Sequence, residues 1–154
     1  MQLKSFMYKT MGLSGILLLT MCQDSPFFHR HVKTNREKWY ADSPAVFELT
    51  ECTETYQANV DVWIRATSEY KYKTLALVAT AECDEQTIWT DTLSILLYND
   101  KGKSTGIGFP FTEYHAEAKP LPLQKGENYK IRIRHIMRDN PVRGVTDCGI
   151  RLSK

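Results

Sequence analysis

Two segments of the chain alternate between apolar and polar positions, and this period of two constrains the fold more strongly than any other sequence feature. Residues 58–66 place Val60, Val62 and Ile64 on one face. Residues 128–137 repeat the pattern, with Tyr129, Ile131, Ile133, His135 and Met137 on one face and Lys130, Arg132 and Arg134 on the other. Because successive side chains of a β-strand point to opposite faces, each segment predicts a strand with one buried face.

Other segments complete an all-β pattern. Residues 44–50, 87–97 and 145–152 have strand length and composition, and the continuous apolar run 74–80 predicts a strand covered on both faces. The stretch 101–126 is rich in glycine and proline and predicts long loops at one end of the domain. No segment has sustained helical periodicity. The sequence therefore predicts two packed antiparallel sheets, a β-sandwich of jelly-roll or immunoglobulin-like type.

The first 21 residues have the pattern of a signal peptide, with Lys4 and Lys9 before a short apolar run. That run is too short to span a bilayer, which needs about 20 apolar residues. Its end resembles the lipobox of bacterial lipoproteins, in the order Leu19, Thr20, Met21 and Cys22. We therefore expect residues 1–21 to be removed and Cys22 to carry a covalent lipid. The alternative is an ordinary secretory leader in which Cys22 is incidental.

Behind the leader, residues 22–36 predict an N-terminal tether and residues 37–154 the sandwich domain. Residues 27–32 fit either a first strand or part of the tether, and the sequence leaves both open. The chain has 20 basic and 18 acidic residues, and two of the basic ones lie in the leader, so the remainder is neutral. This balance argues against nucleic acid as the main partner, because phosphate binding needs a clustered basic surplus.

Cysteine and histidine side chains offer little metal chemistry. Cys52, Cys83 and Cys148 allow at most one internal disulfide, and their spacing matches no zinc pattern; we expect mainly small buried residues and leave any pairing open. His29 and His31 share one strand face and could bind a metal together with a third ligand, His115 or His135. We expect no metal there, because exposed histidines near a tether are the commoner case.

The closing stretch 137–152 is the most distinctive part of the sequence. Its markers are Met137, Arg138, Asn140, Pro141, Gly144, Asp147, Gly149, Ile150 and Arg151. This pattern resembles the closing motif of the gliding motility lipoprotein family GldH of Bacteroidetes. Further landmarks follow in the family's order over residues 39–154: Trp39, Asp42, Pro44, Phe47, Ile64, Arg65, Tyr70, Tyr72, Asp91, Thr92, Leu93, Gly102, Gly106 and Gly108.

The resemblance implies a non-catalytic envelope protein, anchored to a membrane, by expectation the outer one, through lipidated Cys22. Its expected partners are envelope proteins of the motility apparatus, which is linked to type IX secretion, and no cofactor is implied besides the lipid. Relatives also occur in bacteria that do not glide. A surface or periplasmic accessory lipoprotein that binds glycans therefore remains the alternative.

The closing stretch has two interpretations. Asn140, Pro141 and Gly144 suit a tight connection between strands. An ion pair between an arginine, Arg138 or Arg143, and Asp147 would then staple the connection, which predicts that Asp147→Ala lowers the melting temperature. In the second interpretation the stretch docks a partner through the two arginines.

Three further hypotheses concern the sheet faces. Lys130, Arg132 and Arg134 form either a basic binding face for an acidic polysaccharide, a lipopolysaccharide phosphate or an acidic protein, or a solvated outer face. Trp63 lies opposite its apolar neighbours and, if exposed, could stack on a sugar. No nucleophile elbow, phosphate loop or carboxylate pair is recognisable, so we expect no enzyme.

Overall fold

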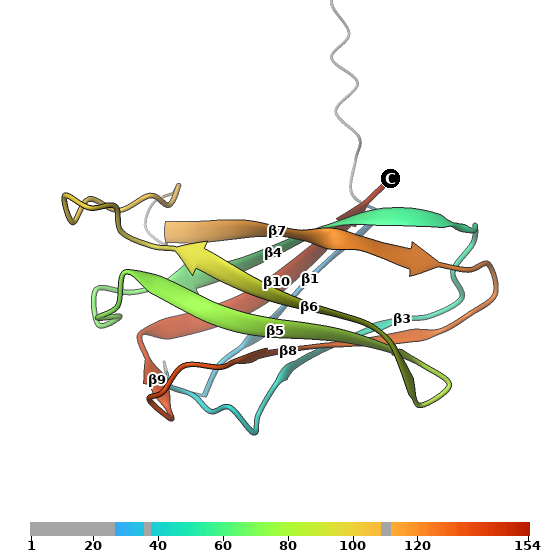
Figure 1. Ribbon diagram of the computed structural model, residues 1–154, viewed down its shortest axis with the longest axis horizontal. Helices are drawn as coiled ribbons and strands as arrows, with labels where there is room; N and C mark the ends of the chain where they lie inside the picture. The colour runs from blue at the N-terminus through green and yellow to red at the C-terminus, as the bar shows by residue number, and fades with distance from the viewer. Residues whose placement is uncertain (1–26, 36–37, 109–111) are drawn as a thin grey trace, which may run out of the picture.

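The computed structural model describes residues 27–35, 38–108 and 112–154, so the predicted leader and Cys22 lie outside the described residues. These residues form ten strands and no helix (Figure 1). The strands are β1 (Phe28–Lys33), β2 (Lys38–Trp39), β3 (Ala45–Leu49), β4 (Tyr56–Ala66), β5 (Thr74–Cys83), β6 (Gln86–Leu96), β7 (Thr112–Leu123), β8 (Tyr129–His135), β9 (Val142–Arg143) and β10 (Val145–Ser153).

Two four-stranded antiparallel sheets make up the domain. The first has the order β1-β10-β4-β7, the second β3-β8-β5-β6, and β2 pairs with β9 in a separate two-stranded ribbon. The eight long strands pair as a nested set: β1 with β10, β3 with β8, β4 with β7, and β5 with β6. A single long hairpin wound into two sheets produces this nesting, which is jelly-roll topology. The predicted sandwich is confirmed, and of its two proposed types the structure has the jelly roll.

The core lies between the two sheets and follows the alternation. Val60, Val62 and Ile64 of β4 point inward and are almost completely buried, as predicted. Ile131 and Ile133 of β8 face them from the second sheet, with no exposed surface. Fully burying one such side chain contributes about 1.5–3 kcal/mol, so the alternating strands supply much of the stability.

The prediction that β5 is covered on both faces is wrong. Leu75 and Leu77 are fully buried, whereas Ala76 and Val78 on the opposite face are only half-buried. β5 is an interior strand of its sheet, but the sheet itself has only one covered face. An apolar run of this length therefore shows that a strand exists but not how many of its faces are covered.

The prediction of loops throughout residues 101–126 is also wrong, because β7 occupies most of the second half of this stretch. Pro120 and Pro122 argued against a strand in the sequence, because proline has no N–H to donate to a β-ladder. β7 lies at the edge of its sheet, and its register with β4 shifts between Ala58 and Val60, so the prolines fall beside a bulge. The Trp89 indole Nε1 donates to the Pro120 carbonyl at 3.1 Å and ties this edge to β6.

The segment near residue 30, for which two interpretations were open, is a strand. β1 pairs with β10 from Phe28↔Leu152 to Lys33↔Asp147. The first strand of the sandwich thus lies within residues 22–36, the range predicted as a tether.

His135 is the one fully buried residue with an ionisable imidazole in the described core. Its Nε2 donates to the Trp39 carbonyl at 3.0 Å, while Nδ1 has no partner. Burial lowers the pKa of His135, and the charge of Arg134 lowers it further. The hydrogen bond to Trp39 raises this pKa but does not offset the effect of burial. The folded protein therefore holds this imidazole neutral under conditions in which the unfolded chain begins to protonate it.

A dependence of stability on pH follows. The pKa of His135 is lower in the folded than in the unfolded chain, so its contribution is complete above about pH 6.5 and is lost as the pH falls below that value. The loss amounts to at most about 1.4 kcal/mol per pH unit. Melting curves between pH 7.5 and 5.5 should show a smaller decrease for His135→Gln than for the native chain. Equal decreases would mean that other groups cause it.

Candidate partner-docking surface

The two ends of the sandwich differ in what they carry. β1 begins and β10 finishes at one end, together with connections 50–55, 84–85 and 124–128; we call this the terminal end. The opposite end, which we call the loop end, consists of residues 38–44, 67–73, 97–108 and 136–144 and includes the β2–β9 ribbon (Figure 1). The predicted docking arginines, Arg138 and Arg143, lie at the loop end, as does Asn140 of the predicted turn.

The closing loop, residues 136–144, is fixed to its surroundings by three contacts. Gly144 has a φ of 81°, a left-handed conformation that suits the tight connection predicted here. Its carbonyl accepts a hydrogen bond from the Thr67 N–H at 2.8 Å. The Asn140 side-chain oxygen accepts one from the Ala41 N–H at 3.0 Å, and Val142 is fully buried. Backbone and core contacts therefore hold the loop in one position.

On this fixed loop, Arg138 and Arg143 are exposed. Arg143 stands opposite Lys38 in the β2–β9 ribbon, so two basic side chains are neighbours. Tyr72 donates a hydrogen bond from its hydroxyl to Asp139 and is 37% exposed, and Tyr40 is 36% exposed. Positioned arginines with tyrosines beside them are typical of protein interfaces.

The predicted ion-pair staple is absent: within the described residues Asp147 pairs with neither Arg138 nor Arg143. Asp147 is 6% exposed, and the basic side chain beside it is His31, with Nε2 3.9 Å from Oδ1. Its Oδ1 atom has no hydrogen-bond partner. Asp147 stands opposite Lys33 and Arg65 on the first sheet, whereas the arginines leave the loop toward solvent. The staple interpretation is therefore corrected to a loop held by Asn140, Val142 and Gly144.

Without Arg138 or Arg143 as its partner, Asp147 contributes less to stability than a stapling residue would. Removing one partner of a buried ion pair costs about 3–5 kcal/mol, whereas neutralising a carboxylate without such a pair costs much less. We expect Asp147→Asn, which keeps the shape of the side chain, to change the free energy of unfolding by less than about 1 kcal/mol. Urea denaturation measures this change. A decrease in the free energy of unfolding of about 3 kcal/mol would instead support a buried ion pair of Asp147.

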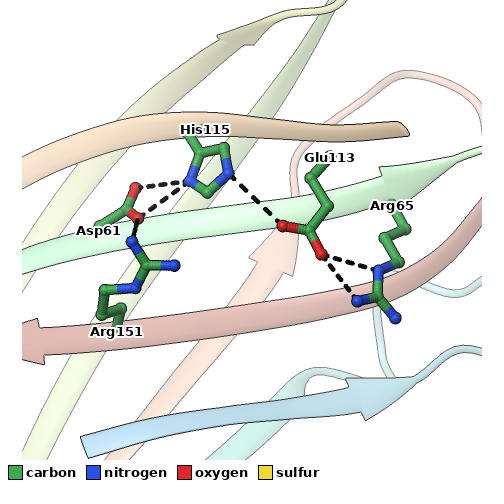
Figure 2. A network of polar contacts seen from close by, with 5 residues as sticks. All are labelled: Asp61, Arg65, Glu113, His115 and Arg151. Atoms are coloured by element: carbon green, nitrogen blue, oxygen red, sulfur yellow. Dashed lines mark hydrogen bonds and ion pairs between the residues drawn. The ribbon is translucent and has the colours of Figure 1, made fainter. Parts of the chain in front are cut away.

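The outer face of the first sheet carries a polar network that joins β4, β7 and β10 (Figure 2). His115 Nδ1 lies 2.9 Å from Asp61, which also lies 3.7 Å from Arg151. His115 Nε2 lies 3.7 Å from Glu113, whose Oε1 accepts from the Arg65 guanidinium at 2.7 and 2.9 Å. Cross-strand pairs of this kind contribute about 0.2–1 kcal/mol each. The network stabilises the sheet, and within it the two arginines and the two carboxylates compensate one another's charge.

Trp63 lies on this outer face but is only 2% exposed. His29 and His31 cover it, with ring centroids 5.8 and 5.7 Å from its own, and the Arg65 guanidinium lies 5.3 Å from the indole centroid. Burial lowers the pKa of His29, as does the charge of Arg151. Trp63 is therefore not exposed for stacking on a sugar, contrary to what the glycan hypothesis requires.

The histidines do not converge on a metal. His29 and His31 pack on Trp63, His115 belongs to the polar network, and His135 lies in the core. Elsewhere in the described chain, ligand atoms of Cys83, Asp84 and Glu127 lie within 4.8 Å of one another. The Cys83 thiol donates to Glu127 at 3.3 Å, and burial and Glu127 raise the pKa of that thiol. We assign no metal to a protonated thiol beside surface carboxylates.

The basic stripe on β8 is mostly neutralised by cross-strand acids. Lys130 lies 3.4 Å from Glu48 on β3, and Arg132 lies 3.2 Å from Glu82 on β5. Arg134 has no ion pair with another described residue. The arrangement favours a solvated outer face over a binding face.

The cysteines behave mainly as apolar residues. Cys52 and Cys148 are buried, Cys83 is partly buried, and all three are free thiols. Burial raises the pKa of Cys148 far above its usual value, so this thiol is not reactive near neutral pH.

Comparisons with known proteins give a family. The family model for the GldH lipoprotein matches residues 27–152. No curated protein matches the chain. Nine chains of solved structures match, and one of them, from the structure of Eiger TNF from S. frugiperda, is 12% identical, covering 82% of this chain and 92% of its own at a TM-score of 0.36. In the part of the chain that the structure describes, no helix could cross a membrane.

Proposed function

The chain belongs to the GldH lipoprotein family, whose model matches residues 27–152, and from this premise we propose that it is a non-catalytic component of the gliding motility machinery. A lipoprotein of this family is a membrane-anchored protein of the cell envelope. The proposal adds that the membrane is the outer one, that the machinery is linked to type IX secretion, and that the chain acts by docking a partner protein.

The anchor in this proposal is a lipid on Cys22. Each buried methylene of an acyl chain contributes about 0.8 kcal/mol, so acyl chains on one residue hold a domain at a membrane without any apolar patch on its surface. The sandwich is then free to use its surfaces for proteins.

One observation supports docking through the loop end. Arg138 and Arg143 are exposed on a loop that Asn140, Val142 and Gly144 hold in place. On the sheet faces, by contrast, most charged side chains are engaged in cross-strand pairs. Arginine is one of the residues enriched among those that carry most of the binding energy of protein interfaces.

The test is a crosslinked pull-down of the tagged protein from cell envelopes, with bound proteins identified by mass spectrometry. We expect motility or secretion proteins to co-purify with the native chain and to decrease for Cys22→Ala and for Arg138→Ala combined with Arg143→Ala. Arg132→Ala, on the second sheet, is the matched control and should keep them. If lipids alone or nothing co-purify, the proposal fails. If glycans co-purify instead of proteins, a glycan-binding accessory lipoprotein becomes the better explanation.

A further inference from the structure

The two ends of the sandwich carry opposite charge. At the terminal end, the connections and Lys154 contribute five acidic residues, Glu51, Glu54, Asp84, Glu85 and Glu127, against two basic ones, Lys125 and Lys154. The loop end contains seven basic and four acidic residues. A chain that is neutral behind its leader therefore has one negative and one positive end.

Most of the basic residues at the loop end are uncompensated. Of the seven, only Lys73 is in an ion pair with another described residue, Asp100. Asp139, one of the four acids, accepts a hydrogen bond from the Tyr72 hydroxyl and is in no ion pair with another described residue. The remaining bases, which have no ion pair within the described chain, are Lys38, Lys71, Lys101, Lys103, Arg138 and Arg143.

Apolar side chains are interspersed with these bases. Ile107 is 78% exposed and Ile136 is 42% exposed, and Tyr40 and Tyr72 are exposed to a similar degree as Ile136. Four of the eight large apolar residues that the described chain exposes thus lie at this one end. Sites for sulfated or phosphorylated surfaces need only basic side chains, whereas a mixture of arginine, tyrosine and isoleucine fits another protein.

The position of the anchor supports a protein partner over the anchoring membrane. Phe27 lies at the terminal end, where its backbone N–H donates to the Leu152 carbonyl. Cys22 is five residues earlier, so a fully extended chain places its lipid within about 18 Å of Phe27. With the lipid on Cys22, as the proposed function has it, the acidic terminal end is the end nearer the membrane, and the loop end lies across the length of the sandwich from it.

We propose that the loop end binds an acidic segment of a partner protein. This inference rests on the proposed docking function and adds the chemistry of the partner: aspartate and glutamate side chains meet Lys38, Arg138 and Arg143, while apolar residues of the partner cover Tyr40, Tyr72 and Ile136. Complementary charge of this kind sets orientation and association rate and weakens as salt is added.

The experiment applies a zero-length carbodiimide to intact envelopes, because this reagent joins lysine amines only to carboxylates that touch them. Peptide mapping should find Lys38, Lys71 and Lys103 joined to aspartate or glutamate of an envelope protein. Arg138→Glu combined with Arg143→Glu changes the loop end from +3 to −1 and should reduce these crosslinks about tenfold, as should 0.5 M salt. Lys125→Glu combined with Lys154→Glu makes the same change in net charge at the terminal end and should leave them unchanged.

Several results would overturn the inference. Crosslinks that survive charge reversal would show that the charges of Arg138 and Arg143 do not hold the partner. Crosslinks that come equally from Lys125 and Lys154 would show that the contact is not specific to the loop end. Dextran sulfate or phosphatidylglycerol vesicles that bind the native protein and lose binding to the Arg138→Glu/Arg143→Glu variant would identify a polyanion or membrane surface as the ligand. Melting curves of both double variants establish that they fold.

The inference and the proposed function fail separately. If the acidic partner joined to the loop end has no part in motility or secretion, the proposed function is wrong and the inference stands. If motility proteins co-purify but no carboxylate is joined to lysines of the loop end, the proposed function stands and the inference is wrong.

Discussion

Gly149→Ala is expected to lower the free energy of unfolding by about 2–3 kcal/mol, which for a domain of this size lowers Tm by about 6–10 °C. A β-carbon at position 149 would lie 2.1 Å from Cε2 and 2.3 Å from Cζ2 of Trp63. The indole packs against Gly149 of β10, and His29 and His31 cover it, so it can avoid the methyl group only by leaving its buried position. Exposure of Trp63 to water should shift the tryptophan emission to longer wavelength. The shift can be assigned to Trp63, because Trp39 and Trp89 stay buried in the core.

A double-mutant cycle tests this explanation. Trp63→Leu removes the ring that the new methyl group would meet, so adding Gly149→Ala to Trp63→Leu should cost much less than adding it to the native chain. Equal costs in both backgrounds would mean that residue 149 matters for the strand itself and not for its contact with Trp63.

The sheets were predictable from the sequence wherever one face is apolar and the other is not. In β4 and β8 the alternation determined both the strand and its buried face, because register and burial follow from the same period of two. β7 was not predictable, because Pro120 and Pro122 signal a break and only the position of the strand at a sheet edge makes them compatible with it. Whether the second face of β5 is covered was not predictable either, because this depends on whether another layer packs on the sheet.

The candidate site was predictable in part. Turn chemistry correctly placed a tight connection at Gly144, whose φ is positive, because the backbone freedom of glycine is a local property of the chain. The ion pair expected between an arginine and Asp147 depended on which way each side chain leaves the loop, and a sequence does not contain that direction. The uncompensated charge of the loop end could not be predicted either, because it arises from four connections far apart in the sequence.

Gly144→Ala is expected to have the largest effect of the single substitutions, a loss of about 3 kcal/mol or about 10 °C in Tm. Two costs add. The left-handed backbone at φ 81° disfavours any residue with a β-carbon, and that β-carbon would lie 2.3 Å from the Tyr70 backbone nitrogen and 2.8 Å from the Glu69 carbonyl carbon. Backbone atoms cannot rotate away as a side chain can, so the hydrogen bond from Thr67 to Gly144 must break and the closing loop must move.

Gly126→Ala is the matched control, because Gly126 has nearly the same φ, 86°, and no atom near the added β-carbon. It should cost only the backbone part, about 1 kcal/mol. The difference between the two variants therefore measures how tightly the closing loop is held against residues 67–73. If the two costs are equal, that contact does not fix the loop, and the argument that Arg138 and Arg143 are held ready for a partner loses its structural basis. If Gly144→Ala also reduces partner capture while Gly126→Ala does not, the position of the loop is what the partner requires.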